Sequence, residues 1–256
     1  MTWEFPSELW DHRFVLLGAY FCLIGGELAW RALQGRALTS PGLLITNVGM
    51  WLVELGLRAG TFGVRLAVFS AVATLVPVRW QPSIWYLVPV YVLVDFVYYW
   101  KHRLLHETSL GWALHAVHHS SDELTLLAAI RLGWIQRLID DFFFIPLLVL
   151  GIQPLALFLL VDLNESLQFW CHTDSIGRLG WLDAVFNTPA NHRVHHARAR
   201  ALANGNYGST FILWDRMFGT WRHDVLPTEF GLEQGAVGLN PLRIQLLPLW
   251  RWLAGR

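Results

Sequence analysis

The spacing of the histidines constrains this chain more than any other feature of its sequence. Eight of the eleven histidines fall in three clusters, spaced H-x3-H, H-x2-H-H and H-x2-H-H: His102 and His106; His115, His118 and His119; His192, His195 and His196. On a helix, residues three and four positions apart share a face, so each cluster would direct two or three imidazoles toward one point. Neutral imidazole is the commonest metal ligand, and eight exceed what one ion can bind. The clusters therefore predict a site for two metal ions.

Composition places this site at a membrane. Of the 256 residues, 54% are hydrophobic and only 15% are charged, and 15 are tryptophan, which is unlike an ordinary soluble domain. The net charge is zero, which argues against a nucleic-acid partner. The two cysteines, Cys22 and Cys171, are too few for a thiolate metal site. We therefore expect an all-α, multi-pass membrane protein whose helical cap holds the metals.

Three apolar segments precede the second histidine cluster. Residues 14–33 and 83–100 are each long enough to span the ~30 Å hydrocarbon core. Residues 43–78 are longer and are interrupted by charged side chains, so we expect two helices there that turn near Arg58. Residues 14–100 are thus predicted to be mainly transmembrane.

A fourth apolar segment, residues 142–169, separates the second cluster from the third. Two complete crossings need ~40 residues, and this segment has 28. A shallow hairpin that turns at residues 151–154 would return the chain to the same side of the membrane. His172 follows the hairpin directly and becomes a ninth candidate ligand.

The polar segments, residues 101–141 and 170–256, are predicted to form one cap, so that residues 1–256 make a single membrane-embedded domain. Nine arginines and six acidic residues lie between residues 173 and 256. Lys101, Arg103, Arg131 and Arg137 flank the first two clusters. The positive-inside rule then places the cap in the cytoplasm.

Four further polar residues are candidates for orienting the ligands, because a metal-bound imidazole usually donates its other N–H to a carboxylate or carbonyl. Asp95 lies seven residues before His102, two turns along the same helix face. Asn164 and Glu165 lie about two turns before His172, and Asn187 precedes the third cluster.

Five segments together resemble a known family. They are DFVYYWKHRLLHE, LGWALHAVHHSSDELTLLAAIR, QFWCHTDSIGRLGWL, FNTPANHRVHH and NYGSTFILWDRMFGTW, and they lie in order between residues 95 and 221. The chain resembles the integral-membrane fatty acid hydroxylase / sterol desaturase superfamily. Within it, the chain looks most like the alkylglycerol monooxygenase branch and its bacterial members. It departs from that branch after His196, where ARARALANGNYG replaces a Gly-Arg-Asn turn.

The resemblance implies an O2-dependent di-iron oxidoreductase that hydroxylates a C–H bond of a lipid, whether fatty acyl, sterol-like or ether lipid. It implies two Fe ions, with Zn an alternative in purified protein. These ions would be held by nine histidines: the eight of the three clusters together with His172. Electrons would come from a separate electron-transfer partner or a reduced pterin, because no dinucleotide, flavin or haem motif is present. The expected location is a bacterial-type inner membrane.

Two alternatives stay open from the residues. The same metal site supports lipid desaturation, in which a second hydrogen is removed in place of oxygen insertion. The other is a zinc-loaded membrane protein that binds a lipid or a partner without catalysis.

Overall fold

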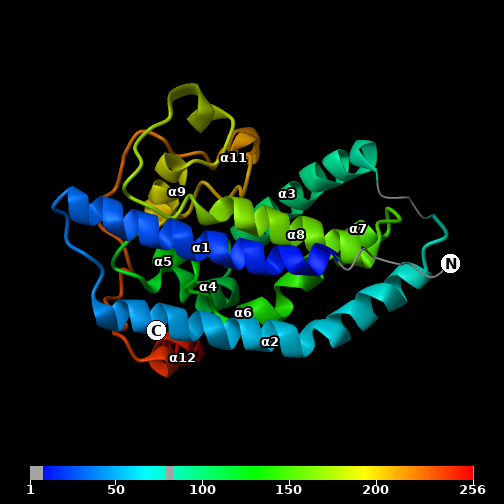
Figure 1. The fold of residues 1–256 in the computed structure, drawn as a ribbon, viewed down its shortest axis with the longest axis horizontal. Coiled ribbons are helices and arrows are strands. Elements are labelled where there is room, and N and C mark those ends of the chain that lie inside the picture. The colour runs from blue at the N-terminus through cyan, green and yellow to red at the C-terminus, as the bar shows by residue number, and fades with distance from the viewer. Residues whose placement is uncertain (1–7, 79–82, 256) are drawn as a thin grey trace. The chain divides into compact units, whose positions relative to one another are not determined.

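The computed structural model describes residues 8–78 and 83–255 and divides the chain into two compact units, residues 1–40 and 41–256. The first unit contains helix α1 (Glu8–Leu33), which includes the predicted span at residues 14–33. The elements of the second unit are also helical (Figure 1), and the described residues contain only two isolated β-bridges and no strand. The chain is therefore all-α, as its sequence predicts.

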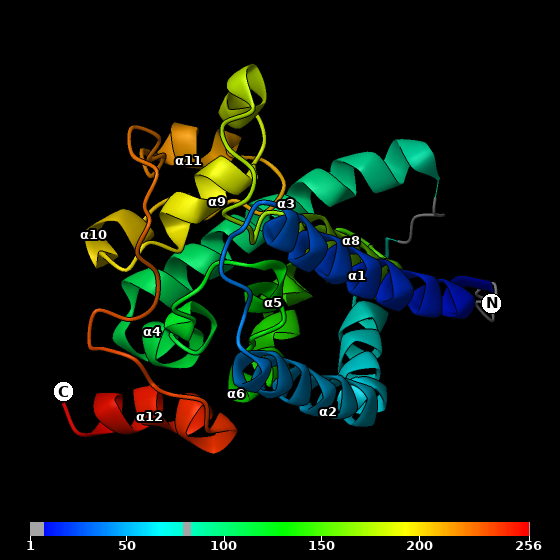
Figure 2. The same ribbon diagram turned by 60° about the vertical axis from the view of Figure 1, so that its left-hand side comes forward.

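Helix α2 (Pro41–Thr74) is continuous, so the two helices predicted within residues 43–78 are wrong. The charges that suggested a turn are accommodated because Arg58 and Arg65 each pair with a carboxylate from a later segment. Figure 2 shows that α2 bends along its length. The Thr61 hydroxyl donates to the carbonyl one turn earlier (2.7 Å), a bond that often bends helices. Among the described helices, α2 is the one that is long and apolar enough to cross a membrane.

Helix α3 (Ile84–Glu107) carries the predicted 83–100 segment onward to the first histidine pair without a break. The chain later turns at Gly151, whose positive φ of 79° suits glycine, between α7 (Ile145–Leu148) and α8 (Pro154–Phe169). Buried apolar side chains of α2, α3, α7 and α8 pack into one core that includes Phe69, Val94 and Leu157. This core packs against the part of α3 that precedes the first histidine pair.

The remaining elements are short and surround the C-terminal end of α3. In Figure 2, α9–α11 lie above this end, and α4, α6 and α12 lie below it. Their bounds are α4 Ser109–His115, η1 His118–Ser120, α5 Leu126–Ala129, α6 Trp134–Ile139, η2 Asp140–Phe144, η3 Gly180–Ala184, α9 Pro189–His195, α10 Arg200–Ala203, α11 Leu213–Phe218 and α12 Pro241–Leu253.

Candidate metal centre

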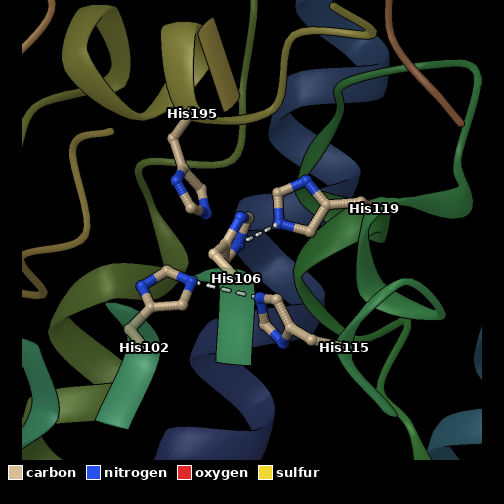
Figure 3. Close-up of side chains that lie close together, drawn as sticks. All are labelled: His102, His106, His115, His119 and His195. Atoms are coloured by element: carbon tan, nitrogen blue, oxygen red, sulfur yellow. Dashed lines mark hydrogen bonds between the residues drawn. The ribbon is translucent and has the colours of Figure 1, made fainter. Parts of the chain in front are cut away.

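The nine predicted histidines meet in the fold as two groups. Within each group the candidate ligand atoms all lie within 4.8 Å of one another, and every histidine is buried. The first group is His102, His106, His115, His119 and His195, and the second is His118, His172, His192 and His196. Figure 3 shows the first group, whose rings converge from α3, α4, η1 and α9.

The two H-x2-H-H clusters divide between the groups. The histidines four residues apart, His115 with His119 and His192 with His196, point to one place as the helical spacing predicts, and the third histidine of each cluster joins the other group. His118 and His119 lie on a 3₁₀ turn, where successive side chains diverge by ~120°. His195 is the last residue of helix α9 and His196 is its C-cap, and successive side chains of an α-helix diverge by ~100°. Each adjacent pair therefore supplies one imidazole to each group.

Ring nitrogens face one another inside both groups. In the first group the Nε2 atoms of His102 and His115 lie 3.1 Å apart, as do those of His106 and His119. In the second group the Nε2 of His172 lies 3.1 Å from that of His118. Nitrogens bound to one ion at ~2.0–2.1 Å lie roughly 3.0–3.4 Å apart at ordinary ligand angles. The spacing therefore fits shared coordination.

The hydrogen bonds of the other ring nitrogen, Nδ1, show that Nε2 carries the free lone pair in two of these histidines. Nδ1 of His102 donates to the Tyr207 carbonyl (2.9 Å), and Nδ1 of His195 donates to the Gly205 carbonyl (2.9 Å). A neutral imidazole has one N–H, so Nε2 of each ring is left as an acceptor. Nε2 of His195 is buried with no hydrogen-bond partner. Buried acceptors that face one another repel unless a cation lies between them, and the arrangement therefore suits metal ions.

The loop that supplies these carbonyls is itself held by two buried carboxylates. Asp215 accepts hydrogen bonds from the backbone N–H groups of Tyr207 and Gly208 (both 2.8 Å). Asn206 between the two carbonyls has a left-handed conformation (φ 56°), which asparagine tolerates better than most residues. Asp95 fixes the far end of the loop, accepting from Thr210 N (2.8 Å).

Burial keeps the imidazoles neutral. Desolvation lowers the pKa of His118 to about 4 and that of His195 to about 3, and it also lowers the pKa of the other seven histidines of the two groups. Neutral imidazole is the form that binds metal. The histidines of both groups are therefore neutral, and able to bind metal, at neutral pH.

Metal-free protein is expected to lose stability as the pH falls below ~6.5, the usual pKa of an unfolded-state histidine. Because burial depresses the folded-state pKa, the unfolded chain binds more protons in this range, and acid favours unfolding. Each histidine contributes a slope of up to ~1.4 kcal/mol per pH unit. Thermal unfolding of metal-free protein between pH 7 and pH 5 measures this effect. An unchanged midpoint across that range would contradict it.

Asp95 does not orient His102, although the helical periodicity predicts it. Seven residues separate the two by ~10 Å along the helix axis, so a shared face brings no contact. Asp95 instead accepts from the indole of Trp214 (2.8 Å) and the amide of Asn164 (2.7 Å), in addition to the loop backbone. Its role is to anchor the loop that bears the Tyr207 carbonyl.

Of the other three residues predicted to orient ligands, two contact no ligand histidine and one lies beside His192. Asn164 bonds Asp95 and no ligand histidine, and Glu165 forms a two-pronged ion pair with Arg137 (2.7 and 2.8 Å). Asn187 does lie at the site: its amide nitrogen donates to the Gly208 carbonyl (2.6 Å) and is 3.4 Å from Nδ1 of His192.

Gln136 is an orienting residue that no sequence pattern predicts. Its side-chain oxygen accepts from Nδ1 of His115 (3.0 Å), and its nitrogen donates to the Asp140 carboxylate (3.1 Å). It lies on α6, 21 residues from its partner, so no local spacing could have revealed it. The backbone carbonyl of Arg131, which accepts from Nδ1 of His118 (3.2 Å), was equally invisible.

Gln136→Leu is expected to weaken metal binding by 10- to 100-fold, the usual cost of losing an outer partner of a ligand histidine. The variant removes the only side-chain acceptor described here for Nδ1 of His115 while keeping similar volume. Titration of metal-free protein with Co(II), followed by visible absorption, measures the affinity. Gln245→Leu is the matched control, since Gln245 is also a buried glutamine but bonds the Leu132 carbonyl. Equal affinities in the two variants would contradict this role.

Beside the metal groups lies a buried network of ion pairs. Arg137 pairs with Glu165 and with Glu54 (3.0 Å), while Lys101 lies 3.8 Å from Asp140. The network contains five carboxylates, Glu54, Asp140, Asp141, Asp162 and Glu165, and four cations, Arg58, Arg65, Lys101 and Arg137. One carboxylate is in excess, and Gln136 links Asp140 to His115. The extra negative charge of this network would partly balance the positive charge of metal ions bound by neutral imidazole nitrogens.

Comparison with known proteins identifies relatives of this architecture. Residues 87–220 match the family model described as fatty acid hydroxylase. The chain is 38% identical over 173 residues to alkylglycerol monooxygenase of Xenopus tropicalis, covering 67% of this chain and 38% of that protein. It is 34% identical over 160 residues to the ornithine lipid hydroxylase OlsE of Rhizobium tropici (61% and 48%). It is 32% identical over 161 residues to a Delta(7)-sterol 5(6)-desaturase of Gibberella zeae (60% and 42%).

Each of these matches spans less than half the length of the relative. No solved structure matches the chain significantly. The similarity includes the histidine clusters and the loop that carries the Tyr207 carbonyl, since both lie within residues 87–220.

Proposed function

The chain belongs to the fatty acid hydroxylase family, as its histidine motifs predict, and we propose that it is a membrane-bound di-iron monooxygenase that hydroxylates a C–H bond of a lipid. One observation carries this proposal. Nine buried histidines form two adjacent groups whose ligand atoms converge, and Nε2 of His195 is buried among them with no hydrogen-bond partner.

We assign His102, His106, His115, His119 and His195 to one ion and His118, His172, His192 and His196 to the other. When bound, two Fe(II) ions would supply the electrons and open positions that O2 activation needs. The protein's part is to hold the imidazoles neutral and oriented. The Tyr207, Gly205 and Arg131 carbonyls fix three of the rings, and Gln136 fixes a fourth. Further electrons would come from a separate carrier or a reduced pterin.

The proposed membrane region consists of α2, the first part of α3 and the hairpin of α7 and α8. Exposed apolar side chains on α2, such as Leu52 (58%) and Val64 (67%), suit contact with lipid. Trp85, 87% exposed at the start of α3, suits the membrane interface. In this arrangement the enzyme is multi-pass, and its histidine-bearing cap faces the cytoplasm of a bacterial-type inner membrane.

The proposed substrate is a membrane lipid. The relatives are named for an alkylglycerol, an ornithine lipid and a sterol, which share long apolar portions and differ in their polar groups. Desaturation is the second candidate reaction, favoured by the similarity to a sterol desaturase.

Product analysis tests the proposal. Iron-loaded protein in lipid nanodiscs, given a reductant and 18O2, is incubated with fatty acyl, sterol and ether lipids, and the products are measured by mass spectrometry. Hydroxylation adds one 18O atom, desaturation removes two hydrogens, and ether cleavage releases an aldehyde and a glycerol. His195→Ala protein is the matched control. Fully iron-loaded protein that forms none of these products would favour a lipid-binding or partner-binding role.

A further inference from the structure

One face of helix α12 is fixed to the rest of the cap and to α2. Asn240 caps its N-terminus by accepting from the backbone of Arg243. Gln245 donates to the Leu132 carbonyl (2.9 Å) and accepts from the backbone N–H of Trp134 (2.9 Å). Ile244 is fully buried in a core cluster with Met50 of α2. The orientation of this helix is therefore set by its buried face.

The opposite face of α12 is apolar and exposed. Leu242, Leu246, Trp250 and Leu253 recur at spacings of three and four, so they form one stripe. They are 61%, 54%, 54% and 75% exposed. A contiguous stripe of this kind marks a surface that meets an apolar partner or a membrane.

The charge pattern of α12 indicates a bilayer surface. The helix contains Arg243 and Arg251 and no acidic residue. Among the residues that the structure describes, neither arginine pairs with a carboxylate. Trp250 and Trp252 are both exposed, and tryptophan favours the headgroup level of a membrane. An apolar stripe flanked by arginine and tryptophan is the pattern of helices that lie in the interface of anionic membranes.

The position of α12 agrees with this pattern. The Thr46 hydroxyl near the start of α2 donates to the Leu239 carbonyl, just before α12 (2.9 Å). The two segments touch so closely that a Cβ atom added to Gly42 would lie 2.8 Å from Leu239 Cδ1. Figure 2 shows α12 near the beginning of α2. Since α2 is the helix apolar enough to cross a membrane, α12 lies near the level at which that helix would begin to enter it.

We infer that α12 is an interfacial helix that binds the surface of an anionic lipid bilayer through Leu242, Leu246, Trp250 and Leu253. This inference rests on the proposed membrane location of the enzyme. The helix lies outside residues 87–220, the part of the chain that matches the family model. Because α12 packs against α4, which ends at His115, membrane contact at this helix also holds the cap against the bilayer.

Site-directed spin labelling tests the inference on the full chain in nanodiscs of phosphatidylcholine and phosphatidylserine. Cys22 is first replaced by serine, and Cys171 is left because it is buried. A nitroxide is then placed in separate variants at Leu246, Val64 and Asp224. Power saturation with O2 and with a nickel chelate measures the depth of each label. Metal content verifies that each labelled protein is folded.

The label at Leu246 is expected at a depth of ~5–10 Å, between the deeper Val64 and the aqueous Asp224. If Val64 contacts lipid but Leu246 is as open to nickel as Asp224, α12 is not interfacial and the proposed span is unaffected. If Val64 itself is open to nickel, the membrane location fails, and the inference fails with it. A label at Leu246 that is shielded from both reagents would mean that protein covers the stripe, which also overturns the inference.

Discussion

Replacing His195 with alanine is expected to reduce turnover to below about one hundredth of wild type and to leave the first metal group unfilled. His195 is the one ligand candidate that α9 supplies to that group, and its Nε2 is buried without a hydrogen-bond partner. Losing even an outer partner of a ligand costs 10- to 100-fold, so losing a ligand costs at least as much. Metal content and lipid oxidation by the same preparation measure the two effects.

His118→Ala tests the second group in the same way, since His118 bonds the Arg131 carbonyl and faces His172. His223→Ala is the matched control. Its side chain is 46% exposed and stacks on Trp221, away from both groups. More than about a tenth of wild-type activity in either ligand variant would mean that the ligand is misassigned. A comparable loss in His223→Ala would mean that any histidine change is damaging.

Glu165→Gln is expected to destabilise the folded protein by ~3–5 kcal/mol, with a fall in the thermal midpoint on the order of 10 °C. The Glu165 carboxylate accepts two hydrogen bonds from the guanidinium of Arg137. It also lies 3.6 Å from the ammonium of Lys101 and 3.7 Å from the guanidinium of Arg58. Glutamine keeps the shape but leaves buried cations with less compensation. Thermal unfolding of detergent-solubilised protein measures the change.

Asp122→Asn makes the same chemical change in an exposed pair. Asp122 lies 3.6 Å from Arg198, and the two side chains are 51% and 44% exposed. Such pairs contribute ~0–1 kcal/mol because water screens them. Equal midpoints for Glu165→Gln and Asp122→Asn would show that the network near the metal groups does not stabilise the fold.

The ligand candidates could be predicted from spacing, but their division between two groups could not. The clusters place His115, His118 and His119 within five residues, which is enough to nominate all three. Whether neighbours point to the same ion depends on local backbone geometry. The 3₁₀ turn at His118 and the end of α9 after His195 separate neighbours that the sequence presents as one motif.

The orienting groups were harder to predict because most of them are backbone carbonyls from distant segments. Tyr207 is 105 residues from His102, and its carbonyl carries no side-chain signature. Asp95 was expected to orient His102, yet its partners are the backbone at Thr210 and the indole of Trp214. Periodicity along a helix identifies a face and leaves the contacted neighbour undetermined.

The same limit explains the error at α2. Charged residues within an apolar segment suggested a break near Arg58, because an unpaired charge in such a segment is costly. Arg58 pairs with Asp162, which lies 104 residues later in the sequence, and Arg65 pairs with Asp141, which lies 76 residues later. Only the packed fold brings them together, and the helix then continues through both arginines.

Metal analysis tests the central proposal most directly. Protein purified without oxygen and reconstituted with Fe(II) is quantified for iron, zinc and chain by mass spectrometry and amino-acid analysis. The two histidine groups predict two ions per chain, with zinc able to replace iron in protein handled in air. One ion or fewer in fully loaded protein would contradict the assignment of two metal sites.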